Sequence, residues 1–300
     1  MALTLVDAQV LSKDVLQAGV IETIVRESSV LSVLPFQTIE GNAYSYNVEK
    51  ALPSVAFRGV NEAYTASEAQ FEQRSENLVI LGGDVELDRF IIQTLSNVND
   101  QVAVQIAEKA KAIANTFTKT FFKGNKATNP KEFDGLDVRI AGSSQEIDGT
   151  IPQISDRKER DLAKLDKLNE LLDAVRGGAD ALFMNKRARR SILAILQGSE
   201  HYVENGVDAF GRPVSMYAGV PLLVVENEIL DDTDIYAVKF GAYTHVTGLT
   251  NGGVQVRRLG ETSAKAVEVT RIEFFCGLAQ FNPYSSARLK NFGVEATATA

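Results

Sequence analysis

The chain has little of what most metal and nucleophile sites are made from. Its 300 residues include one cysteine, Cys276, and two histidines, His201 and His245. A single cysteine excludes an internal disulfide framework and a zinc site built from cysteines, and it suits a reducing compartment. With only two histidines, a zinc or non-haem iron site would consist almost wholly of carboxylates.

Long apolar runs and basic charge are also scarce. No window approaches the roughly eighteen uninterrupted apolar residues of a membrane-spanning helix. The N-terminus has only Lys13 as an early positive charge and does not read as a secretory signal. A net charge of −8 and a pI near 5.0 argue against a general nucleic-acid-binding surface. They do not exclude a protein that encloses nucleic acid without binding it tightly.

Standard catalytic motifs are missing as well. The sequence has no GxGxxG after a strand, no P-loop, no GxSxG elbow and no HExxH. Cys276 and His245 could form a nucleophilic pair. A cysteine in an apolar strand is more typical of packing, however, and His201 in a loop is more typical of a solvated side chain. We therefore predict no enzymatic activity, no cofactor and no metal site.

Two clusters of like charge are candidate binding sites. The acidic cluster in a turn between two strands lacks the glycine and closing glutamate of a calcium loop, so a solvated turn is favoured over a cation site. The basic run has no interleaved aromatic residues, so a solvated helix face or an intersubunit ion pair is favoured over nucleic-acid binding. The acidic residues are Glu226, Glu228, Asp231, Asp232 and Asp234, and the basic ones are Lys186, Arg187, Arg189 and Arg190.

The most unusual segment that is present runs from residue 36 to residue 80. Tyr44, Tyr46 and Val48 alternate with polar residues, which predicts a strand, and residues 78–87 are strand-like again. The stretch 49–73 between them has no core-forming run. Because a lone two-stranded ribbon is marginal in water, we expect this arm to find its partner surface on a neighbouring subunit.

Helical patterns flank this segment on both sides. Before it, Leu16, Val20 and Ile24 predict a helix capped by Ser12 or Asp14, either packed on its own core or laid across a neighbour. After it comes the strongest helix, residues 100–123, about 36 Å long, with Asn99 as cap and Gly124 as stop. Its predicted apolar stripe is Val102, Ile106, Ala110, Ile113, Phe117 and Phe121.

The second half of the chain reads as α/β. Its late strands follow one another without helices between them, which favours a mixed or antiparallel sheet over a parallel one. Asn185 is expected to cap a helix through Leu196. Strands are predicted at 181–184, 220–225, 235–238, 254–256 and 266–276, and a helix is predicted with Leu162, Leu165, Leu168, Leu172 and Val175 on its buried face.

The order of these elements resembles the major capsid protein of tailed bacteriophages, the Hong Kong 97-type fold. The resemblance spans essentially the whole chain and depends on the order and spacing of several stretches. These are residues 29–36 with 41–46 at the start of the extended loop, 121–125 with 133–136 at the exit of the long helix, and 183–190 with 218–221 in the central domain.

The resemblance implies an α+β shell subunit that assembles through hexamers and pentamers into an icosahedral shell around a phage genome. It implies an N-terminal arm at 1–37, an extended loop at 38–77, a peripheral domain at 78–131 and 252–282, and an axial domain at 132–251 and 283–300. It further implies a virion protein assembled in the host cytoplasm, with a separate scaffolding protein, a portal and decoration proteins as partners, enclosed double-stranded DNA and no membrane.

Intersubunit contacts are expected on the arm and at the hairpin tip that joins the two late strands. Val55, Phe57, Tyr64 and Phe71 would be apolar anchors, Arg58, Glu62, Glu68, Glu72 and Arg74 would set the register by charge, and Gly260 with Glu261 would meet neighbouring capsomers. One alternative is an encapsulin-like nanocompartment. Another, of a different class, is a soluble α/β enzyme with an unusual loop.

Overall fold

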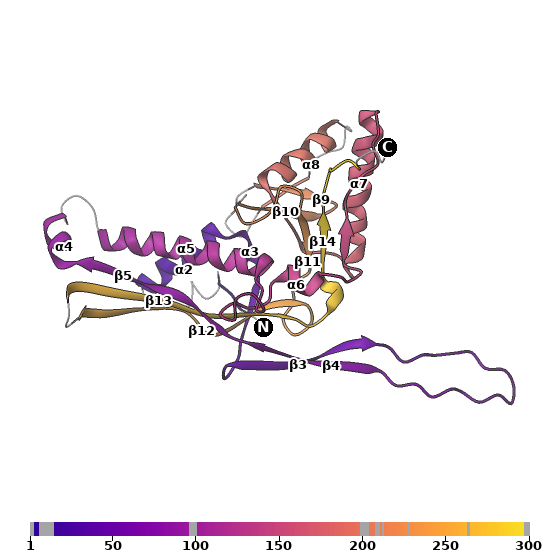
Figure 1. The fold of residues 1–300 in the computed structure, drawn as a ribbon, viewed down its shortest axis with the longest axis horizontal. Coiled ribbons are helices and arrows are strands. Elements are labelled where there is room, and N and C mark those ends of the chain that lie inside the picture. The colour runs from indigo at the N-terminus through magenta and orange to yellow at the C-terminus, as the bar shows by residue number, and fades with distance from the viewer. Residues whose placement is uncertain are drawn as a thin grey trace.

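Two β-sheets, the helices packed on them and one long ribbon make up the chain (Figure 1). The computed structural model describes residues 3–5, 15–95, 101–198, 204–207, 211, 213–226, 228–262 and 265–296. The two sheets share a continuous apolar core with the helices between them, so the ribbon projects from a single packed body.

The first sheet has five strands around a long hairpin. Its order is β1 (Leu3–Thr4), β2 (Pro35–Thr38), β12 (Val246–Thr262), β13 (Lys265–Gln280) and β5 (Val79–Asp88). β12, β13 and β5 are antiparallel, and β2 runs parallel to β12. The late strand predicted from Val254 begins at Val246, because the register with β13 continues on the other side of an irregularity between Thr250 and Val254.

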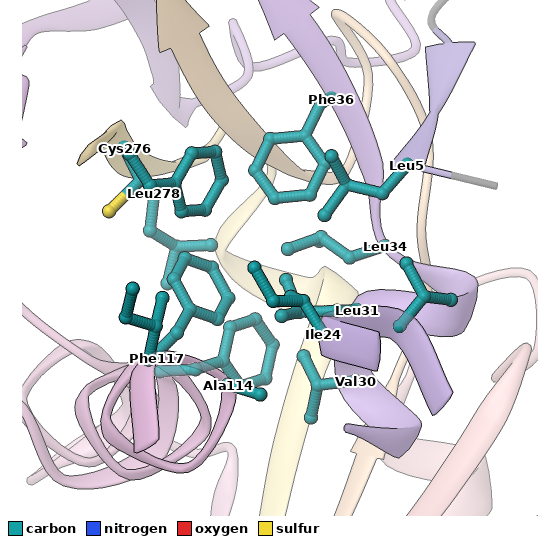
Figure 2. Close-up of a cluster of buried hydrophobic side chains, with 14 of the residues drawn as sticks. Leu5, Ile24, Val30, Leu31, Leu34, Phe36, Ala114, Phe117, Cys276 and Leu278 are labelled. Atoms are coloured by element: carbon teal, nitrogen blue, oxygen red, sulfur yellow. The ribbon is translucent and has the colours of Figure 1, made fainter. Parts of the chain in front are cut away.

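The long helix α5 (Gln101–Lys123) lies along this sheet together with α2 (Val15–Glu27). Phe117 contacts the ring of Phe36 at 6.1 Å and that of Phe274 at 5.8 Å between centroids, which joins helix, β2 and β13 in one aromatic cluster. Figure 2 shows Phe36 and Phe117 beside Ile24, Leu31 and Leu34. The predicted stripe is confirmed except that Val102 is only partly buried, and the buried face also includes Ala114 and Phe122.

The N-terminal helix packs on the chain's own core, which is the simpler of the two alternatives. Val20, Ile21, Ile24 and Val25 of α2 are buried in the same cluster as α5. A short helix, α3 (Ser29–Val33), follows, and α4 (Arg89–Leu95) follows β5. The caps predicted at Ser12, Asp14 and Asn99 lie outside the described residues.

The second sheet has seven strands and is mixed, as predicted. Its order is β6 (Glu146–Asp148), β14 (Ser286–Lys290), β11 (Ile235–Val238), β7 (Ala181–Asn185), β10 (Val220–Val225), β9 (Pro213–Tyr217) and β8 (Glu204–Val207). β7 pairs parallel with β10 and antiparallel with β11. Both central strands β7 and β11 are buried throughout, which explains their uninterrupted apolar sequences.

Two helices belong to the core of this sheet, α7 (Arg157–Ala174) and α8 (Lys186–Gly198), and the short α6 (Leu136–Ile140) and a 3₁₀ turn (Pro283–Ser285) complete the fold. The predicted buried face of α7 is partly wrong. Leu165, Leu168 and Leu171 are buried at three-residue spacing, so Leu172 is only partly buried. Leu162 stays 62% exposed, one turn before the first α7 residue that joins the core.

Candidate assembly surface

The ribbon is a two-stranded sheet of its own that extends beyond the body (Figure 1). It consists of β3 (Ala43–Ala51) paired antiparallel with β4 (Gln70–Asn77). The prediction that residues 78–87 form its return half is wrong. That stretch is β5, which pairs with β13 along its length as an edge strand of the five-stranded sheet, whereas Leu78 closes the ribbon by donating its N–H to the Asn42 carbonyl at 2.9 Å.

The root of the ribbon has a core within its own chain. Tyr46 and Val48 are buried in a small cluster with Leu249 and Ala279, and the Tyr46 ring lies 4.7 Å from that of Phe281. The predicted alternation of β3 is confirmed, because its apolar face is the one that covers the sheet. The expectation that this half lacks a local partner is therefore wrong.

A buried ion pair also fixes the root. Arg139, at the end of α6, donates from Nη1 to Glu76 Oε1 on β4 at 2.7 Å, and their side chains are 5% and 16% exposed. Arg139 also donates to the carbonyl oxygens of Asp134, at 2.9 Å, and Leu278, at 3.0 Å. The Tyr46 hydroxyl donates to the same Glu76 oxygen at 3.3 Å. Burial raises the pKa of Tyr46 and the charge of Glu76 adds to this, against the opposing charge of Arg139, so the hydroxyl stays a donor at neutral pH.

The tip of the ribbon, residues 52–69, is exposed and apolar. The side chains of Val55, Phe57 and Val60 are 96%, 108% and 93% exposed, and Tyr64 is 68% exposed. Exposed apolar side chains gathered on one projection make this tip a candidate contact surface. The sequence prediction that this segment lacks a local core holds for these residues.

Two charged residues of the tip, Arg58 and Glu62, bind the main chain of the turn between them. Arg58 Nη1 donates to the Glu62 carbonyl at 2.8 Å, and the Glu62 carboxylate accepts from the Gly59 N–H at 2.8 Å. The Arg58 guanidinium lies 5.2 Å from the centre of the Tyr64 ring. These contacts hold the turn at residues 59–62 beside the exposed apolar side chains.

The other predicted contact residues fall in two places. Phe71, on the outward face of β4, is 66% exposed, and Glu72 lies 3.6 Å from Arg74. Glu68 is exposed in the tip. Gly260 has a φ of 78° at an irregularity near the end of the β12–β13 hairpin, followed by Glu261, and the turn residues 263–264 lie outside the described residues. Ribbon tip and hairpin end lie at opposite ends of the molecule (Figure 1).

The cysteine and histidine candidates show no sign of a reactive pair. Cys276 is buried in β13, and burial raises the pKa of its thiol, which disfavours the reactive thiolate. His245 lies just before β12 with its Nδ1 buried, and burial followed by the charge of Lys239 lowers its pKa. His201 lies outside the described residues. Within the described ranges no group of three or more metal-binding side chains comes together.

The acidic and basic clusters pair with each other across the start of α8. Lys186 Nζ lies 2.7 Å from Glu226 Oε2, and Arg187 Nη1 lies 2.8 Å from Asp232 Oδ2. Asn185 caps the helix by accepting from the Ala188 N–H at 2.8 Å, as predicted. These pairs favour a structural role for both clusters.

Sequence reasoning did not find Glu76 and Arg139. They lie 63 positions apart, and neither stands in a motif. The available signal was weak: Arg139 is a single charge between the apolar residues Val138 and Ile140 of α6, and such a charge usually has a buried partner.

Comparison with known proteins supports the fold. Residues 12–157 match the family model described as major capsid protein GP7. Over the whole of both chains, the structure resembles the holo-SrpI encapsulin complex from Synechococcus elongatus PCC 7942, with 18% identity and a TM-score of 0.65. The fold is of the Hong Kong 97 type.

Two further structures share the Hong Kong 97-type fold over most of the chain. A chain from Mycobacterium phage Bobi aligns with 13% identity and a TM-score of 0.65, covering 90% of this chain and 91% of its own. The capsid of the native GTA particle aligns with 14% identity and a TM-score of 0.64, with the same coverage. No curated protein sequence matches the chain. No helix in the described part has the length and apolar character that a membrane crossing requires.

Proposed function

We propose that this chain is a major capsid subunit that assembles with copies of itself into a closed shell. One observation carries the proposal: a ribbon fixed to the body at its root ends in an apolar tip that nothing in the described chain covers. The match to a major capsid family and the Hong Kong 97-type fold support a shell-forming function. The role is structural rather than enzymatic.

The tip residues supply the association energy in this proposal. Burying a valine or phenylalanine side chain is worth about 1.5–3 kcal/mol, so Val55, Phe57 and Val60 together outweigh the rim charges, each worth at most about 1 kcal/mol when exposed. A closed shell multiplies each contact by symmetry, so modest individual contacts suffice. Tyr64 and Phe71 extend the apolar surface, and Gly260 with Glu261 form a second contact at the other end of the subunit.

The proposed domain division follows the two sheets only in part. Residues 78–131 and 252–282, with α5, β5, β13 and most of β12, would be the peripheral domain, although β1, β2 and the start of β12 complete its sheet from outside these bounds. Residues 132–251 and 283–300, with the seven-stranded sheet, would be the axial domain. Residues 1–37 would be the N-terminal arm and 38–77 the extended loop. Hexamers and pentamers of such subunits would enclose double-stranded DNA without reading its sequence, in a virion assembled in the host cytoplasm with scaffolding, portal and decoration proteins.

Deleting residues 50–72 tests the proposal. The variant should give a folded protein by circular dichroism that stays a small species by light scattering, while the unmodified chain forms megadalton particles in negative-stain images. Shells of normal yield from the deletion variant would refute the role of the ribbon tip, and failure of the unmodified chain to form particles would refute the shell function.

A point substitution sharpens the same test. Phe57→Asp removes the most exposed anchor and should abolish particles without changing the thermal midpoint, since the side chain makes no buried contact in the subunit. Thr65→Asp, in the same exposed loop, adds the same charge without removing an apolar side chain and should assemble. Equal loss of assembly in both variants would show that charge, and not apolar burial, is responsible.

The alternative is a nanocompartment shell that holds protein cargo. One alignment that covers all of both chains is with an encapsulin complex, which supports this alternative. Purified particles would decide: nuclease-protected double-stranded DNA supports the capsid, whereas a co-purifying protein in a nucleic-acid-free particle supports the nanocompartment.

A further inference from the structure

We propose that Arg139, Glu76 and Tyr46 form a latch that sets the direction in which the ribbon leaves the body. The proposal deepens the shell function and depends on it. In it, these three are positioning residues, because they act on assembly only through the angle of the arm.

The contacts of the latch join three separate parts of the fold. Arg139 belongs to α6 and binds Glu76 of β4 at 2.7 Å while its Nη2 donates to the Leu278 carbonyl of β13 at 3.0 Å. Tyr46 of β3 donates to Glu76 and accepts from the Gln280 N–H at 3.3 Å. One guanidinium and one phenol therefore tie both ribbon strands to the five-stranded sheet and to the segment that follows α5.

The buried hydrogen bonds of Arg139 make this attachment directional. A buried guanidinium keeps its charge only where fixed partners replace its water, and here those partners are one carboxylate and two main-chain carbonyls. A bidentate or multiply bonded arginine tolerates little change in angle. The apolar contacts of Tyr46 and Val48 hold the ribbon against the sheet, but apolar contact is non-directional. The latch supplies the orientation that packing alone leaves loose.

The length of the ribbon magnifies any change at its root. From Tyr46 to Val60 the extended chain spans roughly 46 Å at about 3.3 Å per residue. A swing of about 10° at the root would therefore move the tip by roughly 8 Å, more than the width of a side-chain contact. A tip that must meet one surface on a neighbour requires a fixed root.

The chain offers a matched control pair. Arg271 of β13 and Asp84 of β5 form a two-point ion pair at 2.7 and 2.8 Å, comparable in chemistry to the latch, but exposed and within one sheet. Removing it deletes an ion pair without touching the ribbon. Both charges of a pair should be replaced together, since removing one partner of a buried pair leaves an uncompensated charge.

The direct test measures the arm in unassembled subunits. In the full-length Phe57→Asp background, spin labels on Ala66→Cys in the tip and Asp166→Cys on α7 report the distance between tip and body, and Cys276 is buried away from the label. The double variant Glu76→Met with Arg139→Met should broaden this distance distribution by roughly 8 Å or more. Asp84→Met with Arg271→Met should leave it unchanged. An unchanged distribution in the latch variant would overturn the proposal.

Milder variants cover the case in which the double variant does not fold. Tyr46→Phe removes only a hydroxyl, and Arg139→Lys keeps the charge but loses the fork of donors. Both variants should broaden the distance distribution less than the double variant does. The Arg139→Lys distribution should be closer to that of the Phe57→Asp parent than the Tyr46→Phe distribution is. Distributions as narrow as the parent's in both would equally overturn the latch.

Assembly with Phe57 restored links the latch to function. The latch variant should give fewer shells, or shells of mixed diameter, in negative-stain images, while the control pair variant assembles normally. A broadened arm with normal shells would overturn the claim that the latch positions the arm for assembly. Failure of the unmodified chain to form any particles would instead overturn the proposed function itself, so the two failures are distinguishable.

Discussion

The N–H of Gly135 donates to the carbonyl of Gly124 at 2.9 Å, and this contact closes the loop between α5 and α6. A Cβ on Gly135 would lie 2.5 Å from the Thr120 carbonyl oxygen, and one on Gly124 would lie 2.4 Å from the Phe133 carbonyl oxygen. Neither glycine has a positive φ, so close approach of two backbones, and not turn conformation, requires glycine at both positions.

Gly135→Ala should therefore lower the free energy of unfolding by about 1–3 kcal/mol, the cost typical of forcing extra atoms into a packed site. Gly19→Ala is the control, because nothing lies within 4 Å of a Cβ there and the residue is inside α2. It should stabilise the protein by about 0.5–1 kcal/mol. Denaturant titration measures both, and equal effects would contradict the close-approach explanation.

Lys123 forms ion pairs with two carboxylates that differ in burial, Asp231 and Asp234, so a buried and an exposed ion pair can be compared at one lysine. Lys123 Nζ lies 3.2 Å from each carboxylate, but Asp231 is 73% exposed and Asp234 only 6%. Asp234 also accepts from Arg288 at 2.5 Å. Asp234→Ala should cost about 1–3 kcal/mol, because Lys123 and Arg288 lose a buried carboxylate partner and keep Asp137 as the one they share, whereas Asp231→Ala should cost at most about 1 kcal/mol. Similar losses in urea unfolding would show that burial is not the deciding factor.

Periodicity made the central elements predictable from sequence. The stripe of α5, the buried β7 and the Asn185 cap follow from local patterns that the structure confirms. The second strand of the ribbon was not predictable in the same way. Residues 70–77 carry mostly polar side chains, so they give no strand signal, and their strand exists because β3 pairs with it.

The candidate assembly surface likewise has one part that the sequence predicts and one part that it does not. The exposed tip was predictable because its residues form no periodic apolar face. The latch was not, since it joins residues 63 and 30 positions apart through contacts that only the tertiary fold creates. Likewise, the separate charge clusters near residues 186 and 232 gave no signal that they neutralise each other.

Acid should weaken the junction between β6 and the C-terminal segment. Asp148 accepts from the Thr150 hydroxyl at 2.7 Å and from Asn291 at 3.2 Å, and these bonds hold its pKa below the usual range. A depressed folded-state pKa contributes stability that is present above the unfolded value, near 3.9, and is lost as pH falls through the folded value. Asp148→Asn should therefore flatten the fall in thermal midpoint below about pH 4. Asp166→Asn, an exposed carboxylate on α7, is the charge-matched control, and an equal flattening there would exclude the specific bonds as the cause.

Cys276 should report unfolding of the five-stranded sheet. Its side chain is fully buried in β13 between the partner strands β12 and β5, and burial raises the pKa of the thiol. Both effects suppress reaction with a thiol reagent, since the thiolate is the nucleophile and it must also be reached. In the native protein, labelling should be slow and should follow the global unfolding free energy as denaturant is added. A surface cysteine, Asp166→Cys, should react at once under the same conditions. Rapid native labelling of Cys276 would mean that the edge strand β5 opens independently of the rest of the core.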